Sequence, residues 1–319
     1  MKPGSNRSSR TRTPVNPSSR PTKRRWRIHD AFSDSQGGGS IEIAGLDWGG
    51  DGPIALLHHP NGFCAATWGL VAEQLCTRYR VIAVDARGHG DSDSRPVPEG
   101  YQWDYLVSDL GQVATRLLEE TGQAAIEFGI GSSLGGIITA AAEALHPGLF
   151  RLIAMLDPPI HPDEALRHEL NLELPTIRPN IADQARKRSP VWPSRDTARQ
   201  AWRDKPVFSA WQPRAFELYL QEGFRDRDDG SVELKCHPHV EATIFETAGS
   251  LDTFEFAPRV AAPVLLIRAG QGFFPPVIFE HLAGLFPNCT YRVVDAGHLL
   301  PMESPDLVLD LLDDFASAQ

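Results

Sequence analysis

The sequence predicts an α/β protein with a mostly parallel, doubly wound sheet and a helical cap inserted into that sheet. From about residue 40, short β-branched runs alternate with longer runs that carry apolar residues at helical spacing, and the short runs are apolar on both faces. Such runs are typical of parallel strands that helices cover on both sides. The alternation stops near residue 160 and resumes near residue 263, which predicts one sheet with an insertion.

The predicted elements follow one another as strand, helix, strand, the order in which helices connect parallel strands. Strands are expected over residues 54–59, 80–86, 124–129, 151–156, 263–268 and 290–294. Core helices are expected over 69–79, 103–120, 134–145, 277–285 and 305–315, and cap helices over 195–203 and 214–222. The predicted boundaries are a core over 40–159 and 251–319 and a cap over 160–250.

Charge and composition limit the classes of partner. The 319-residue chain has a formal net charge of -10, which argues against nucleic acid, because phosphate binding requires a basic surface. Residues 1–28 differ from the rest, since they are rich in Lys and Arg and contain no Asp or Glu. A disordered basic leader is therefore expected over 1–39. No run of about 18 apolar residues is present, so no membrane partner is expected.

The cysteines Cys64, Cys76, Cys236 and Cys289 are widely spaced and form no CxxC pair. No Cys/His cluster has the spacing of a zinc site, so neither a metal nor another cofactor is expected. Free thiols and a cytoplasmic location are the expectation in the absence of a secretory signal. The expected partner is a small-molecule substrate, and the sequence leaves a homo-oligomer open.

A glycine-rich turn joins the strand expected at 124–129 to the helix expected at 134–145. Residues 131–135 of this turn read GSSLG and match the pattern G-x-S-x-G. In a sharp strand-to-helix turn, the serine is strained and exposed, and only small residues fit two positions before and after it. The start of the helix then directs N–H groups toward developing negative charge. Ser133 is therefore the predicted nucleophile.

A histidine near the end of the chain is the predicted general base. The strand expected at 290–294 leads into the segment DAGH, which ends at His298. A loop after the last strand can return to the C-terminal edge of the sheet, where Ser133 also lies and where open α/β sheets place their sites. An imidazole with a pKa near 6.5 is suited to accept the serine proton, so His298 takes this role.

Together these segments resemble the α/β-hydrolase superfamily, in particular its capped esterase, lactonase and C–C hydrolase branch. The resemblance implies an oxyanion hole formed by two backbone N–H groups, that of Leu134 and that of Asn61, where His59-Pro60 replaces the usual His-Gly. The motifs are specific for the fold and say little about the substrate. The resemblance covers about residue 40 to the end and rests on LLHHPNGFCAATW (56–68), VIAVDARGHGDSD (81–93), GIGSSLGG (129–136), LDPP (156–159) and GHLLPMESP (297–305).

The resemblance also implies a carboxylate that orients the histidine. Most members of the superfamily carry this acid after the seventh strand, in a segment like G-x-x-D, but this chain has Phe273 there. Asp157 follows the strand at 151–156 at the same sheet edge as Ser133, and some members, including certain fungal lactonases, carry their acid in this place. Asp157 is therefore the predicted acid. The weaker alternatives are Asp295, Asp252 and Asp85.

The cap is expected to fold over the site and to contact the substrate. Its aromatic residues favour a bulky, partly apolar substrate, although they would equally serve to pack the cap onto the core. The segment CHPHVEA (236–242) lacks the geometry of a metal site and is a candidate for a loop that returns to the active site. The aromatic residues are Trp192, Trp202, Phe208, Trp211, Phe216 and Tyr219.

The predicted function is a serine hydrolase that cleaves a carboxylic ester or lactone of a bulky, partly apolar small molecule. It would use a Ser-His-Asp triad and form an acyl-enzyme. The same residues would serve the hydrolysis of an amide or a C–C bond. Two other classes remain: a cofactor-free dioxygenase that uses the His298–Asp157 pair, and a non-catalytic receptor that retains the pocket.

Overall fold

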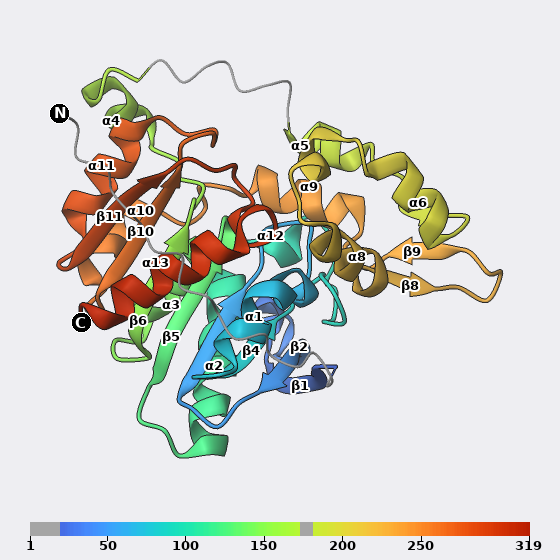
Figure 1. The fold of residues 1–319 in the computed structure, drawn as a ribbon, viewed down its shortest axis with the longest axis horizontal. Coiled ribbons are helices and arrows are strands. Elements are labelled where there is room, and N and C mark those ends of the chain that lie inside the picture. The colour runs from blue at the N-terminus through green and yellow to red at the C-terminus, as the bar shows by residue number, and fades with distance from the viewer. Residues whose placement is uncertain (1–19, 173–180) are drawn as a thin grey trace, which may run out of the picture.

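The computed structural model describes residues 20–172 and 181–319, and one eight-stranded sheet forms its centre (Figure 1). The first two strands in the sheet order pair antiparallel with their neighbours, and all later pairs are parallel. This arrangement confirms the predicted fold class. The sheet order is β1 (Thr22–His29), β2 (Ser40–Gly49), β4 (Arg80–Val84), β3 (Ile54–His58), β5 (Ile126–Ser132), β6 (Phe150–Leu156), β10 (Val264–Ala269) and β11 (Cys289–Val294).

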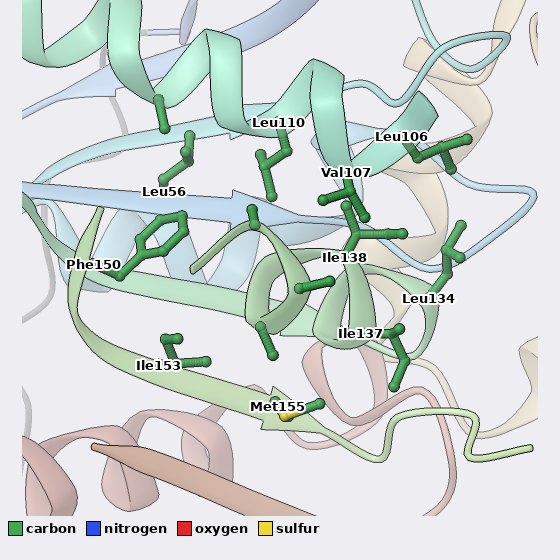
Figure 2. Close-up of a cluster of buried hydrophobic side chains, with 14 of the residues drawn as sticks. Leu56, Leu106, Val107, Leu110, Leu134, Ile137, Ile138, Phe150, Ile153 and Met155 are labelled. Atoms are coloured by element: carbon green, nitrogen blue, oxygen red, sulfur yellow. The ribbon is translucent and has the colours of Figure 1, made fainter. Parts of the chain in front are cut away.

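Helices pack on both faces of the sheet and bury one apolar cluster on each face. One face carries α2 (Trp103–Thr121), α3 (Leu134–Leu145) and α11 (Pro276–Leu285), and the other carries α1 (Gly69–Leu75) and α13 (Pro305–Ser317). Neighbouring residues of β3 enter opposite clusters, Leu56 the first and Leu57 the second, because side chains alternate along a strand. Figure 2 shows the first cluster, in which Leu106, Val107 and Leu110 of α2 and Leu134, Ile137 and Ile138 of α3 meet Leu56, Phe150, Ile153 and Met155 of the sheet.

The leader predicted over residues 1–39 is wrong for the part of it that the structure describes. Strand β1 pairs with β2 along its full length, so the core begins no later than Thr22, whereas residues 1–19 lie outside the described residues. The reason is a period of two within the basic stretch. Trp26 and Ile28 are buried, while the alternate residues Arg25 and Arg27 point to solvent. The basic composition hides this alternation, which is the ordinary pattern of a half-buried strand.

The insertion between β6 and β10 contains helices and a small antiparallel sheet, the latter not predicted from the sequence. In the view of Figure 1, α6, α8, β8 and β9 of the insertion lie to the right of the core. The strands are in the order β7 (Val191–Trp192), β9 (Val232–Leu234) and β8 (Phe224–Asp226). The helices are α4 (Glu164–Glu169), α5 (Ile181–Arg186), α6 (Arg195–Trp202), α7 (Pro206–Ser209), α8 (Pro213–Glu222), α9 (Pro238–Glu246) and α10 (Thr253–Phe256).

All four cysteines are free thiols. Within residues 20–172 and 181–319, no helix is both long and apolar enough to cross a membrane. The same residues contain no group of three or more His, Cys, Asp or Glu side chains arranged to hold a metal ion.

Arg87 ties together the loop that follows β4. Its guanidinium is fully buried and donates from Nε and Nη2 to the two carboxylate oxygens of Asp109 on α2, at 2.6 and 2.7 Å. Further bonds reach the Gly100 carbonyl oxygen at 3.1 Å and Asp30 Oδ1 at 3.2 Å. A bidentate pair of this kind fixes both geometry and charge. The loop between β4 and α2 is therefore held from three sides.

Replacing Arg87 by leucine should destabilise the protein strongly, because the buried Asp109 carboxylate would lose its cation. We expect the free energy of unfolding in urea to fall by about 3–5 kcal/mol. The control is Arg116→Ala, which removes an exposed pair with Glu119 and should cost less than about 1 kcal/mol. Equal losses in the two variants would show that the buried network does not have this role.

Candidate active site

Ser133 stands at the turn between β5 and α3 in a strained backbone conformation, with φ 52° and ψ -123°. Non-glycine residues rarely take a positive φ, and such strain is found mainly at functional sites. Glycine is required at positions 131 and 135 because a larger residue would clash with the backbone. A Cβ atom on Gly131 would lie 2.1 Å from the Gly135 carbonyl oxygen, and one on Gly135 would lie 2.2 Å from the His58 carbonyl oxygen. The spacing G-x-S-x-G therefore follows from backbone packed directly against backbone.

The structure brings the three residues predicted as nucleophile, base and acid together. His298, on the loop between β11 and α12 (Leu300–Glu303), has its Nε2 atom 3.0 Å from Ser133 Oγ. Its Nδ1 atom lies 2.6 Å from Asp157 Oδ2. Since an ionised carboxylate only accepts hydrogen bonds, Nδ1 carries the proton, and Nε2 faces the serine hydroxyl as an acceptor. The arrangement suits proton transfer from Ser133 to His298.

Asp157 is held rigidly where β6 ends. Its side chain is 1% exposed, and its second oxygen, Oδ1, accepts a hydrogen bond from the Ala269 N–H on β10 at 2.8 Å. Its own φ is positive, at 46°. The neighbouring loop leaves space for the carboxylate only because residue 272 is glycine, where a Cβ atom would lie 2.6 Å from Asp157 Oδ2. The ring of Phe273, at the usual acid position, lies beside His298 with 5.5 Å between ring centroids.

The alternative carboxylates have other partners. Asp295 accepts a hydrogen bond from the Gln271 side chain at 3.0 Å. Asp252 accepts bonds from two N–H groups at the start of α10, so it caps that helix. Asp85 accepts bonds from the backbone N–H groups of Ala65 and Asp91 and thereby connects two loops of the core. Each of these carboxylates is accounted for by local structure.

A carboxylate that the sequence did not single out supports the loop carrying His298. Glu303 accepts a hydrogen bond from the Leu299 N–H at 3.1 Å, and a Cβ atom on Gly297 would lie 2.1 Å from its Oε2 atom. Burial raises the pKa of Glu303. Its contacts on both sides of His298 fix the path of the loop. Its position in GHLLPMESP was visible in the sequence, but its contacts were not.

The turn after β3 holds Asn61, one of the two predicted oxyanion donors. β3 pairs with β5, so this turn and Ser133 lie at the same edge of the sheet. The N–H of Gly62 donates to His89 Nε2 at 3.0 Å, which leaves the N–H of Asn61 as the donor available to a substrate in the predicted role. Leu134, the other predicted donor, is the first residue of α3, where N–H groups have no partner within the helix.

Three buried histidines surround the base of this turn. The rings of His58 and His59 stack with 5.5 Å between centroids, and those of His59 and His89 lie 5.0 Å apart. Burial lowers the pKa of His58 and of His89 to about 4, and it lowers the pKa of His59 as well. Neutral rings accept hydrogen bonds, as His59 Nε2 does from the Ala86 N–H at 3.0 Å. The turn is therefore supported by uncharged imidazoles at neutral pH.

The aromatic residues of the insertion pack against one another. The rings of Trp202 and Phe208 stack at 5.4 Å, and Phe63 of the core contacts Trp211 at 5.1 Å. Packing accounts for these side chains, so they give no support for a bulky substrate. Five of the six are at most 8% exposed: Trp202, Phe208, Trp211, Phe216 and Tyr219.

One residue of the segment 236–242, Glu241, lies next to the candidate site, and the sequence suggested such a return of the chain. His237 and His239 are exposed, and His237 caps α9. Glu241 is buried against the turn after β3, and its carbonyl oxygen accepts a hydrogen bond from Asn61 Nδ2 at 2.9 Å. The neighbouring contacts of Arg188 and Tyr219 carried no sequence signal, because those residues lie far from Asn61 along the chain.

The sequence profile of the α/β hydrolase family matches residues 55–311, and the chain belongs to this family. It is 27% identical to the N-formylmaleamate deformylase of Pseudomonas putida over 87% of this chain and 96% of the deformylase. It is 32% identical to an esterase of Mycobacterium tuberculosis over 85% of each chain. The crystal structure of E-2-(acetamidomethylene)succinate hydrolase shares the fold, with a TM-score of 0.72, 20% identity and coverage of 92% and 100% of the two chains.

The buried histidines should make the protein sensitive to acid. Because the folded state lowers the pKa of His58 and His89 from 6.5 to about 4, it binds fewer protons than the unfolded state in that interval. The stabilisation is complete above about pH 6.5, and we expect the free energy of unfolding to fall as the pH decreases toward 4.

Urea denaturation across this pH range measures the effect. Burial raises the pKa of Asp85, which acts in the opposite direction, so the useful comparison is between variants. The pH slope should be smaller in His89→Gln than in wild type and unchanged in His239→Gln, which alters an exposed histidine. An unchanged slope in His89→Gln would contradict the prediction.

Proposed function

We propose that this α/β hydrolase cleaves a carboxylic ester or lactone by acyl transfer to water, with Ser133 as nucleophile. The single observation that supports this most strongly is the hydrogen-bonded series from Ser133 Oγ through both His298 nitrogens to Asp157. The series has the order and the distances that a Ser-His-Asp triad requires. The kinship with an esterase supports the same reaction type.

In the first step, Ser133 Oγ attacks the substrate carbonyl carbon while its proton moves to His298 Nε2. The carbonyl electron pair shifts to oxygen, where the N–H groups of Asn61 and Leu134 stabilise the negative charge. Asp157, buried beside Nδ1, stabilises the imidazolium that forms. His298 then protonates the leaving alcohol, and an acyl-enzyme remains.

In the second step, water is the nucleophile and His298 acts again as the general base. His298 removes a proton from water, the water oxygen attacks the acyl carbon, and the same two N–H groups stabilise the second oxyanion. Collapse releases the carboxylic acid and returns the proton to Ser133. A lactone would follow the same route and leave as a hydroxy acid.

Amide hydrolysis is the second candidate, and the likeness to a deformylase favours it. An amide requires the same attack, but His298 must protonate a nitrogen as it leaves. The dioxygenase alternative would use His298 and Asp157 and would consume O₂ without acylating Ser133. A fluorophosphonate probe together with an oxygen electrode separates these reactions. A cytoplasmic location and a small-molecule substrate belong to the same proposal.

Ser133→Ala should abolish hydrolysis, because Ser133 supplies the attacking oxygen in the proposed mechanism. We expect kcat for p-nitrophenyl acetate to fall by about 10⁶-fold and fluorophosphonate labelling to disappear. Ser132→Ala is the matched control, since it removes the hydroxyl of the preceding residue and should leave the labelling intact. A rate near that of wild type in Ser133→Ala would refute the proposed function.

Asp157→Asn should test the displaced acid separately. The amide cannot stabilise the imidazolium, and it favours the wrong tautomer of His298, so kcat should fall by about 10⁴-fold. Asp295→Asn removes the carboxylate three positions before His298 and should change kcat by less than about threefold, since Asp295 is engaged by Gln271. The reverse order of effects would assign the acid to Asp295.

A further inference from the structure

The oxyanion turn, residues 60–63, is held from outside by the insertion. Tyr219 on α8 donates from its hydroxyl to the Gly62 carbonyl oxygen at 3.2 Å. The carbonyl oxygen of Glu241 on α9 accepts the bond from Asn61 Nδ2 at 2.9 Å. Both bonds are buried. The second bond connects the insertion directly to Asn61, whose N–H faces the substrate in the proposed function, and the first connects it to the adjacent Gly62.

A third residue, Arg188, fixes these two partners relative to each other. Its Nη1 atom donates to the Glu241 carboxylate, and its Nη2 atom donates to the Tyr219 hydroxyl oxygen at 3.2 Å. Its guanidinium also lies over the ring of Trp202 at 5.5 Å. Burial raises the pKa of Tyr219, so its hydroxyl keeps the proton that it donates to Gly62. The bonds made by Arg188, by the Tyr219 hydroxyl and by Asn61 Nδ2 each pair a donor with an acceptor.

The core holds the same turn from the opposite side. The Gly62 N–H donates to His89 Nε2, while the Gly62 carbonyl oxygen accepts from Tyr219. The two peptide groups that flank Gly62 are thus oriented by different parts of the molecule. The Cα atom of Gly62 also lies against the carboxylate of Glu241, where a Cβ atom would be 2.7 Å from Oε1. An oxyanion donor contributes only when its direction is fixed before the reaction.

We propose that Tyr219 and Glu241 are positioning residues for oxyanion stabilisation, so that the insertion completes the oxyanion hole of the core. This proposal rests on the proposed function. Packing of the insertion against the core then affects catalysis, because the oxyanion turn has all of its partners only when α8 and α9 lie against it. Loss of either partner lowers kcat, whereas ground-state binding of a neutral substrate is little affected.

The test is Tyr219→Phe, which removes the hydroxyl and keeps the ring in its packing. With p-nitrophenyl acetate we expect kcat to fall about 5- to 10-fold, the cost of one hydrogen bond, with KM changed less than twofold. The control is Tyr101→Phe. Tyr101 is also fully buried, and its oxygen accepts a bond from the Arg95 N–H at 2.9 Å away from the oxyanion turn. It should leave kcat within twofold.

A second variant guards against a loss of folding in the first. Asn61→Ala removes the bond to the Glu241 carbonyl but keeps the backbone N–H that serves the oxyanion, and kcat should again fall about 5- to 10-fold. The inhibition constant of trifluoroacetone should rise in parallel with the loss of kcat in both variants. Ser133 adds to this ketone, its proton passes to His298, and the ketone oxygen becomes an oxyanion in the same hole.

The outcomes separate the two proposals. Equal kcat values in Tyr219→Phe and Tyr101→Phe, or a loss expressed in KM alone, would overturn the positioning role while the Ser133→Ala result left the hydrolase proposal standing. Full activity in Ser133→Ala would overturn both proposals, because the oxyanion hole serves an attack by that serine. A parallel loss in kcat and trifluoroacetone binding supports the positioning role.

Discussion

The contact of backbone with backbone at the turn between β5 and α3 is the constraint on which the site depends. Gly131 and Gly135 permit it, and the second of them lies directly against the end of β3 at His58. The close approach forces Ser133 into its strained conformation and directs the start of α3 toward the same point. It also brings the turn after β3 next to the serine. One steric requirement therefore places the hydroxyl and both proposed N–H donors.

The position of the proposed acid, Asp157, follows from the order of strands. β6 and β10 are neighbours in the sheet, so the loops that follow them leave the same edge side by side. A carboxylate on either loop reaches the same imidazole. In this chain the loop after β10 passes over Asp157 at Gly272 and places a phenylalanine beside His298. The carboxylate gains a hydrogen bond from the neighbouring strand, which holds it without help from solvent.

Sequence patterns predicted the core because burial on both faces leaves a strong signal. They also predicted that Ser133, His298 and Asp157 lie at one edge of the sheet, because motifs mark strand ends. β5 was placed too early, at 124–129, because the glycine-rich segment after Gly129 suggested a turn, whereas the strand continues to Ser132. The strands of the small sheet are too short to show an alternation of apolar and polar residues. The bond between Tyr219 and Gly62 joins residues far apart in the chain, and no local pattern encodes such a contact.

Strand β1 also bears on solubility at high concentration, because it lies at one edge of the sheet. An edge strand exposes unpaired backbone groups and invites another chain to extend the sheet. Here the solvent-facing positions include Lys23, Arg25 and Arg27, long charged side chains of the kind that discourage pairing at an edge. The basic stretch, whose composition hides a strand, is thus well suited to keep that edge from recruiting a second copy.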